Sequence, residues 1–160
     1  MLKSLGAFLL VVIMVSCDGQ TVKAEYSPTQ NGIWNKDSVV AFSFKELDTL
    51  QEYDMFINVR NDGTYLYSNL FLIAELQFPN GDMQRDTLEY EMSKPDGEWL
   101  GTGYGSLKEN KLWYKENVVF PTSGVYTLEI SHAMRKNGLV DGIVELEGIT
   151  DVGYLIEKSN

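Results

Sequence analysis

The sequence contains only one cysteine and one histidine, Cys17 and His132. A single cysteine cannot form an internal disulfide, and zinc sites built from several histidine and cysteine ligands are excluded. No serine elbow or second histidine is present to build a hydrolase triad. The run Gly-Thr-Gly-Tyr-Gly at 101–105 lacks the lysine and hydroxyl residue of a phosphate loop. We therefore predict no enzyme, no metal site and no soluble cofactor, with calcium bound by clustered aspartates left open.

Basic residues are also scarce. Lys and Arg together number 13 against 23 Asp and Glu, which gives a formal net charge of −10. Acidic proteins are repelled by nucleic acid and by anionic lipid, so the sequence predicts neither as a partner. An aromatic content of 12% excludes disorder as the overall state of the chain.

Long hydrophobic runs are confined to the first 16 residues. After Lys3, residues 5–15 are apolar apart from Gly6, a length typical of a secretory signal and too short for a folded transmembrane helix. Ser16 directly before Cys17 resembles a bacterial lipoprotein signal. We predict a cleaved signal peptide at 1–16, and at 17–20 a cysteine carrying diacylglycerol and an N-acyl lipid, followed by a short spacer. An ordinary secretory signal with an incidental cysteine is the alternative.

Residues 21–160 predict one all-β domain, a single antiparallel β-sandwich of about eight strands. Alternating apolar and polar residues mark the clearest strands, and turn residues separate almost every pair. The expected strands are 21–26, 39–44, 53–60, 70–78, 83–92, 118–120, 125–133, 142–149 and 152–157. Residues 98–105 are expected to form a loop, and 107–117 one turn or short helix. Leu72, Leu128 and Ile130 are predicted in the core.

Several segments resemble the gliding-motility lipoprotein family GldH of the Bacteroidota. They are Arg60–Leu70, Asp86–Tyr90, Pro95–Gly101, His132–Arg135 and Gly148–Gly153. The resemblance implies a non-enzymatic envelope lipoprotein that is needed for gliding and linked to type IX protein secretion, with other envelope or gliding and secretion proteins as partners. It offers no catalytic residues to carry over. Asp18 without a following acidic run favours an outer-membrane lipoprotein facing the periplasm.

Six side chains are candidates for contact with a partner protein or a glycan: Arg60, Tyr67, Asn69, Trp99, Tyr104 and Trp113. In the structural interpretation, Arg60 pairs with a carboxylate, Asn69 caps a turn, and the aromatic rings close the end of the core. In the functional interpretation, they form a contact surface for an envelope protein, or the aromatic rings stack on peptidoglycan or another glycan. His132 is expected at the edge of the core, bonded to backbone.

Overall fold

A computed structural model describes residues 20–160 of the chain. Cys17 and the predicted signal peptide lie outside the described residues. Ten strands form the described part: β1 (Thr21–Pro28), β2 (Ile33–Asn35), β3 (Val40–Phe44), β4 (Glu52–Asn61), β5 (Asn69–Gln77), β6 (Met83–Glu91), β7 (Lys108–Val119), β8 (Tyr126–His132), β9 (Glu145–Glu147) and β10 (Ile149–Lys158). Residues 20–160 include no helix that is long and apolar enough to cross a membrane.

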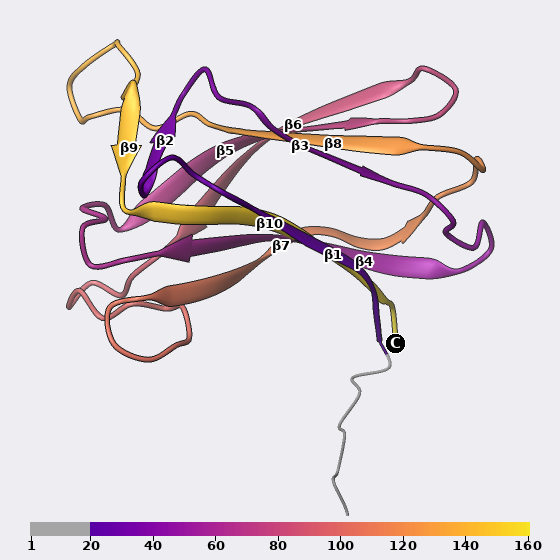
Figure 1. The fold of residues 1–160 in the computed structure, drawn as a ribbon, viewed down its shortest axis with the longest axis horizontal. Coiled ribbons are helices and arrows are strands. Elements are labelled where there is room, and N and C mark those ends of the chain that lie inside the picture. The colour runs from indigo at the N-terminus through magenta and orange to yellow at the C-terminus, as the bar shows by residue number, and fades with distance from the viewer. Residues whose placement is uncertain (1–19) are drawn as a thin grey trace, which may run out of the picture.

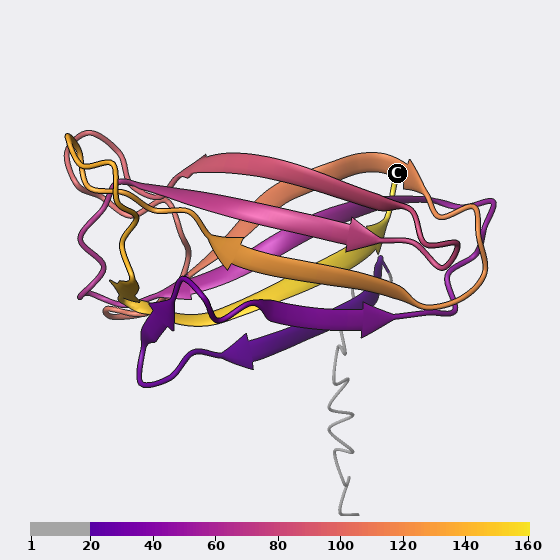
Figure 2. The same cartoon turned by 90° about the horizontal axis from the view of Figure 1, so that it is seen from above.

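Two four-stranded antiparallel sheets face each other. One has the strand order β1-β10-β4-β7, and the other has the order β3-β8-β5-β6. Figure 1 shows the two layers from the side, and Figure 2 shows the strands of the second sheet running across the first. The short strands β2 and β9 pair at one end of the molecule. The predicted all-β sandwich is confirmed, with ten strands in place of about eight.

The core lies between the two sheets. On β4, Tyr53, Met55, Ile57 and Val59 are buried, as the alternating pattern predicts. The predicted core residues Leu72, Leu128 and Ile130 are each 0% exposed. The strand phases inferred for β5 and β8 are therefore correct.

The expected turn or short helix at 107–117 is wrong, because this segment is part of the twelve-residue strand β7. The alternation in β7 is hidden because the buried Asn110 is polar and the exposed Trp113 is apolar, the reverse of the usual pattern for a sheet with one face toward solvent. Two register shifts in its pairing with β4 interrupt the pattern further, and Asn117 adopts a φ of 50°. The strand forms because β4 supplies a full-length hydrogen-bonding partner, which local sequence does not reveal.

The region of the two shortest strands also differs from expectation. The predicted strand at 142–149 is only Glu145–Glu147, and Gly148 separates it from β10. Its partner β2 was not expected, because three residues carry too little pattern. The irregular structure expected at 98–105 is confirmed.

Candidate functional site

The structure separates the six candidate side chains. Arg60 and Trp113 lie on the outer face of the β1-β10-β4-β7 sheet, since each belongs to a strand of that sheet and alternates with buried residues. Tyr67 and Trp99 contact the buried Tyr65 near the β4–β5 loop. Tyr104 stands alone and is 100% exposed on the β6–β7 loop. These side chains do not form one surface.

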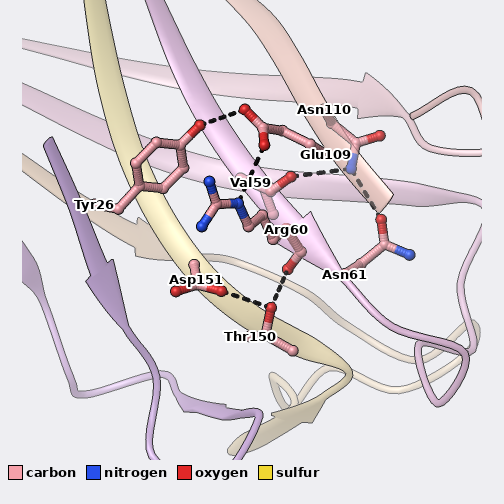
Figure 3. A network of polar contacts seen from close by, with 8 residues as sticks. All are labelled: Tyr26, Val59, Arg60, Asn61, Glu109, Asn110, Thr150 and Asp151. Carbon is pink, nitrogen blue, oxygen red and sulfur yellow. Dashed lines mark hydrogen bonds and ion pairs between the residues drawn. The ribbon is translucent and has the colours of Figure 1, made fainter. Parts of the chain in front are cut away.

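Arg60 belongs to a network that crosses the outer face of the sheet. Its Nε donates to Glu109 Oε2 at 3.2 Å, and the Tyr26 hydroxyl donates to Glu109 Oε1 at 2.6 Å. The guanidinium carbon lies 4.1 Å from the centre of the Tyr26 ring. Figure 3 shows the three side chains pointing toward one another. The expected pairing of Arg60 with a carboxylate is confirmed.

Gly153 on β10 makes room for this network. Tyr26 on β1 and Asn58 on β4 both pair with Gly153. A Cβ at Gly153 would lie 2.5 Å from Glu25 O and 2.7 Å from Tyr26 Cδ1. Tyr26 therefore lies across β10 and reaches Glu109 on β7. Its burial, and then its hydrogen bond to Glu109, raise the pKa of Tyr26 to about 12, which keeps the hydroxyl a neutral donor.

Removal of the Tyr26 hydroxyl tests whether the network of Tyr26, Arg60 and Glu109 stabilises the sheet. Tyr26→Phe removes one hydrogen bond to a carboxylate that is partly exposed, so we expect a loss of about 0.5–1.5 kcal/mol in the free energy of unfolding. The matched control Tyr104→Phe removes a hydroxyl that is fully exposed and should leave stability unchanged. Chemical denaturation of the two variants measures both. Equal stabilities for the two variants would contradict a structural role for the network.

On the inner face of the same sheet, the side chains of Asn110 on β7 and Asn61 on β4 form a buried amide pair. Asn110 Nδ2 donates to Val59 O at 3.1 Å and to Asn61 Oδ1 at 2.9 Å (Figure 3). Both asparagines are buried. The pair joins β7 to β4 and satisfies polar groups that would otherwise be costly in the core. Sequence reasoning missed Asn110 because its partner lies 49 residues away.

The second group of candidates closes one end of the core. Tyr65 is buried, and its ring centroid lies 5.7 Å from that of Tyr67 and 6.1 Å from that of Trp99. Its hydroxyl donates to Asn69 O at 2.6 Å. The Asn69 side chain donates to Glu89 Oε1 across the sheet, instead of capping a turn as expected. Asn69 begins β5 and pairs with Glu91, so Glu89, two residues along β6, is its diagonal neighbour on the same face of the sheet.

Trp113 is the most prominent exposed aromatic on a strand. It is 55% exposed, and its ring centroid lies 4.3 Å from that of Phe56. The Lys111 ammonium lies 4.1 Å from the Phe56 ring centre on the same face. Trp113 and Lys111 thus cover Phe56, which is buried although it faces outward. This is a mixed aromatic and charged surface rather than a flat row of rings.

His132 lies in the core, where it holds β2 against the second sheet. Its Nε2 lies 3.0 Å from Trp34 O, and the Met134 amide lies 3.4 Å from Nδ1. Because Nδ1 accepts, Nε2 carries the proton and donates. The expected core-edge histidine bonded to backbone is confirmed. Among residues 20–160, no group of three or more His, Asp or Glu side chains is placed to hold a metal ion.

Burial of His132 makes stability depend on pH. Burial lowers the pKa of His132 below its ordinary 6.5, so the unfolded chain binds a proton more readily than the folded one. Stability from the neutral ring is present above about pH 6.5 and is lost as the pH falls toward the lower folded pKa. We expect the wild type to lose more unfolding free energy between pH 7.5 and 5.5 than His132→Gln. Equal losses in denaturation at both pH values would contradict this.

Comparison with known proteins shows the family to which the chain belongs. The family model described as GldH lipoprotein matches residues 21–156. A protein of Christiangramia forsetii named gliding motility lipoprotein GldH homolog is 57% identical over 150 residues, which is 94% of this chain and 91% of that protein. The gliding motility lipoprotein GldH of Flavobacterium johnsoniae is 43% identical over 160 residues, covering 99% of each chain.

Solved structures are more distant. The infectious bursal disease virus VP2 subviral particle aligns with a TM-score of 0.39 at 16% identity, covering 86% of this chain. The chain spans about 30% of the length of that protein, and the likeness carries no argument about function. The family match over 21–156 and the two close relatives decide the classification. The chain belongs to the GldH family of gliding motility lipoproteins.

Proposed function

We propose that this protein is a membrane-anchored envelope lipoprotein that serves the gliding motility apparatus, and the type IX secretion linked to it, through protein–protein contact. The observation that carries the proposal is its identity to two proteins named as gliding motility lipoproteins over nearly the whole chain. The role is non-enzymatic. The side chains that the sequence singled out for chemistry or contact, Arg60, Asn69 and His132, are engaged in holding strands together.

The anchor sets where the domain works. Lipid on Cys17 holds the chain at a membrane, since each buried acyl methylene contributes about 0.8 kcal/mol and two or three chains make release negligible. Three residues separate Cys17 from Thr21, where β1 begins, and the four Cα–Cα steps between the two residues span at most roughly 14 Å. The Thr21 end of the sandwich therefore lies close to the membrane, which we propose is the outer membrane, with the domain in the periplasm.

Contact with protein is better supported than contact with a glycan. Glycan binding would favour a flat row of exposed rings, whereas Tyr104 and Trp113 belong to different segments and Tyr67 and Trp99 pack on the core. Trp113 lies beside Lys111 in a mixed surface, which is the composition expected of a protein interface. A tether also raises the local concentration of partners in the same membrane, so that weak contacts suffice.

Gene deletion tests this function. In the bacterium that makes the protein, loss of the chain should stop gliding and reduce type IX secretion together, and the wild-type gene should restore both. A complementing Tyr104→Phe variant serves as a control that retains the fold. Normal gliding and secretion after deletion would contradict the proposal, and loss of gliding with normal secretion would remove its type IX part.

A further inference from the structure

Exposed aliphatic side chains gather at the end of the sandwich that lies away from Thr21. Leu66 belongs to the β4–β5 loop, and Leu139, Val140 and Val144 belong to the segment between β8 and β9. Each is at least half exposed. Single exposed aliphatic side chains are ordinary, but a cluster contributed by two separate segments marks an interaction site.

Three of these side chains border a groove of about 430 Å³. Thr64, Leu66 and Tyr67 line it from the β4–β5 loop, and Leu139 and Val144 line it from the segment between β8 and β9. Glu145 and Glu147 of β9 line it as well. The groove therefore has a lining from two loops and a strand.

The charge of the groove is strongly one-sided. Asp141, Glu145 and Glu147 line it and are exposed, and Lys136 is its single lysine. Within residues 20–160, none of the three carboxylates forms an ion pair or a side-chain hydrogen bond. Complementary charge is what steers and orients a partner, so the groove suits a segment that carries lysine or arginine.

The strand β9 also presents a free edge. Its only strand partner among the described residues is β2. Lys36 N donates to Val144 O and Gly148 N donates to Gly32 O, so residues 144, 146 and 148 exchange hydrogen bonds with β2. By the alternation of antiparallel pairing, the backbone groups of Glu145 and Glu147 point away from β2. Such an edge can accept an added strand.

This edge is held rigidly by the core beneath it. Trp34 of β2 and Leu146 of β9 pair with each other and are both buried. The Trp34 carbonyl is bonded to His132 on the second sheet. Figure 1 shows β2 and β9 standing together at the end of the sandwich away from the C-terminus. A preformed site avoids the ordering cost that a mobile one would have on binding.

We propose that this groove binds an extended segment of another envelope protein, rich in basic and aliphatic residues, which adds to the free edge of β9. The proposal rests on the proposed function and names the chemistry of its partner. A second copy of this chain is disfavoured as the partner, because the chain has a net charge of −10 and two acidic grooves repel each other. A surface of anionic lipid is disfavoured for the same reason, and the tether holds the opposite end near the membrane.

Site-specific photocrosslinking in living cells tests this inference with the full-length lipoprotein. A photoreactive amino acid replaces Val144 in the groove or, as a matched control, Val125 at the other end; the two valines are 50% and 52% exposed. We expect an adduct from position 144 and none of the same mass from position 125. Mass spectrometry of the adduct should map the crosslink to a segment that alternates Lys or Arg with aliphatic residues.

Charge variants give the second arm of the test. Glu145→Gln/Glu147→Gln should lower the yield of the position-144 adduct at least fivefold. The control Glu89→Gln/Glu91→Gln removes two charges with the same spacing on β6 and should change it less than twofold. In the adduct, amide exchange of residues 145 and 147, whose backbone groups point away from β2, should slow at least tenfold, as expected for an added strand.

The inference would be overturned by the absence of an adduct, by the same adduct from position 125, or by an adduct with lipid or with a second copy. It would also be overturned if Glu145→Gln/Glu147→Gln left the adduct yield unchanged. An acidic mapped segment would overturn it as well. Failure of the proposed function is distinguishable, because it appears as normal gliding in the deletion strain whatever the crosslinks show. Failure of the inference alone leaves gliding dependent on the chain and independent of Glu145 and Glu147.

Discussion

Replacement of Cys17 by alanine should abolish attachment of the protein to the membrane. The thiol is the only atom of the chain on which a thioether to diacylglycerol can form, since the sequence holds no other cysteine. The variant should not label with a fatty-acid analogue in growing cells. It should also keep residues 1–16 as an uncut precursor, visible as a larger mass on a denaturing gel.

Ser16→Ala provides the control for this experiment. It keeps a small residue directly before Cys17 and keeps the thiol, so it should still label and be cut. Unchanged labelling of Cys17→Ala would remove the basis for the envelope location. Loss of labelling together with cleavage before residue 17 would instead indicate an ordinary secretory signal.

Gly148→Ala should be among the most destabilising single substitutions in the domain. Gly148 has a φ of 87°. Its amide donates to Gly32 O and its carbonyl accepts from Asp62 N, so its backbone connects three segments of the chain. A Cβ there would lie 2.5 Å from Tyr65 Cα and nearer still to Tyr65 N. Backbone cannot move aside as a side chain can, so we expect a loss of about 4 kcal/mol or more in unfolding free energy.

Gly138→Ala separates this clash from the strain of positive φ alone. Gly138 has a φ of 81°, and nothing lies within 4 Å of the added methyl. This control should cost only about 1 kcal/mol, the usual penalty for a left-handed alanine. Denaturant unfolding compares both variants with the wild type. A loss for Gly148→Ala no larger than that for Gly138→Ala would show that the junction of β9 and β10 is loosely packed.

The strands with regular alternation were predictable from sequence. Residues 53–60 and 125–133 repeat apolar side chains at every second position, and a two-residue period leaves little choice about which face is buried. The same rule fails for β7, whose outer residues include Trp113 and whose inner ones include Asn110. An edge strand with bulges forms because a neighbouring strand supplies its hydrogen-bonding partners. Which strand is the neighbour depends on the tertiary structure, which local sequence does not show.

The candidate site was predictable only in part. A carboxylate partner for Arg60 was expected, but Glu109 itself was not, because it lies 49 residues away in a segment read as non-strand. The place of Tyr26 across Gly153 depends on strand order, which alternation cannot supply. The groove beside β9 depends on two loops that meet only after folding, so Leu66 and Val144 carried no signal in sequence.

Action by contact rather than chemistry is tested most directly with conservative variants in a strain whose only copy of the gene is altered. His132→Gln, Glu109→Gln on β7 and Glu129→Gln on β8 each remove one titratable group. Each variant is scored for folding, for partners co-purified after crosslinking, and for gliding. Every variant that folds and keeps its partners should glide like the wild type. A folded variant that keeps its partners and does not glide would contradict action by contact and restore a chemical role for that side chain.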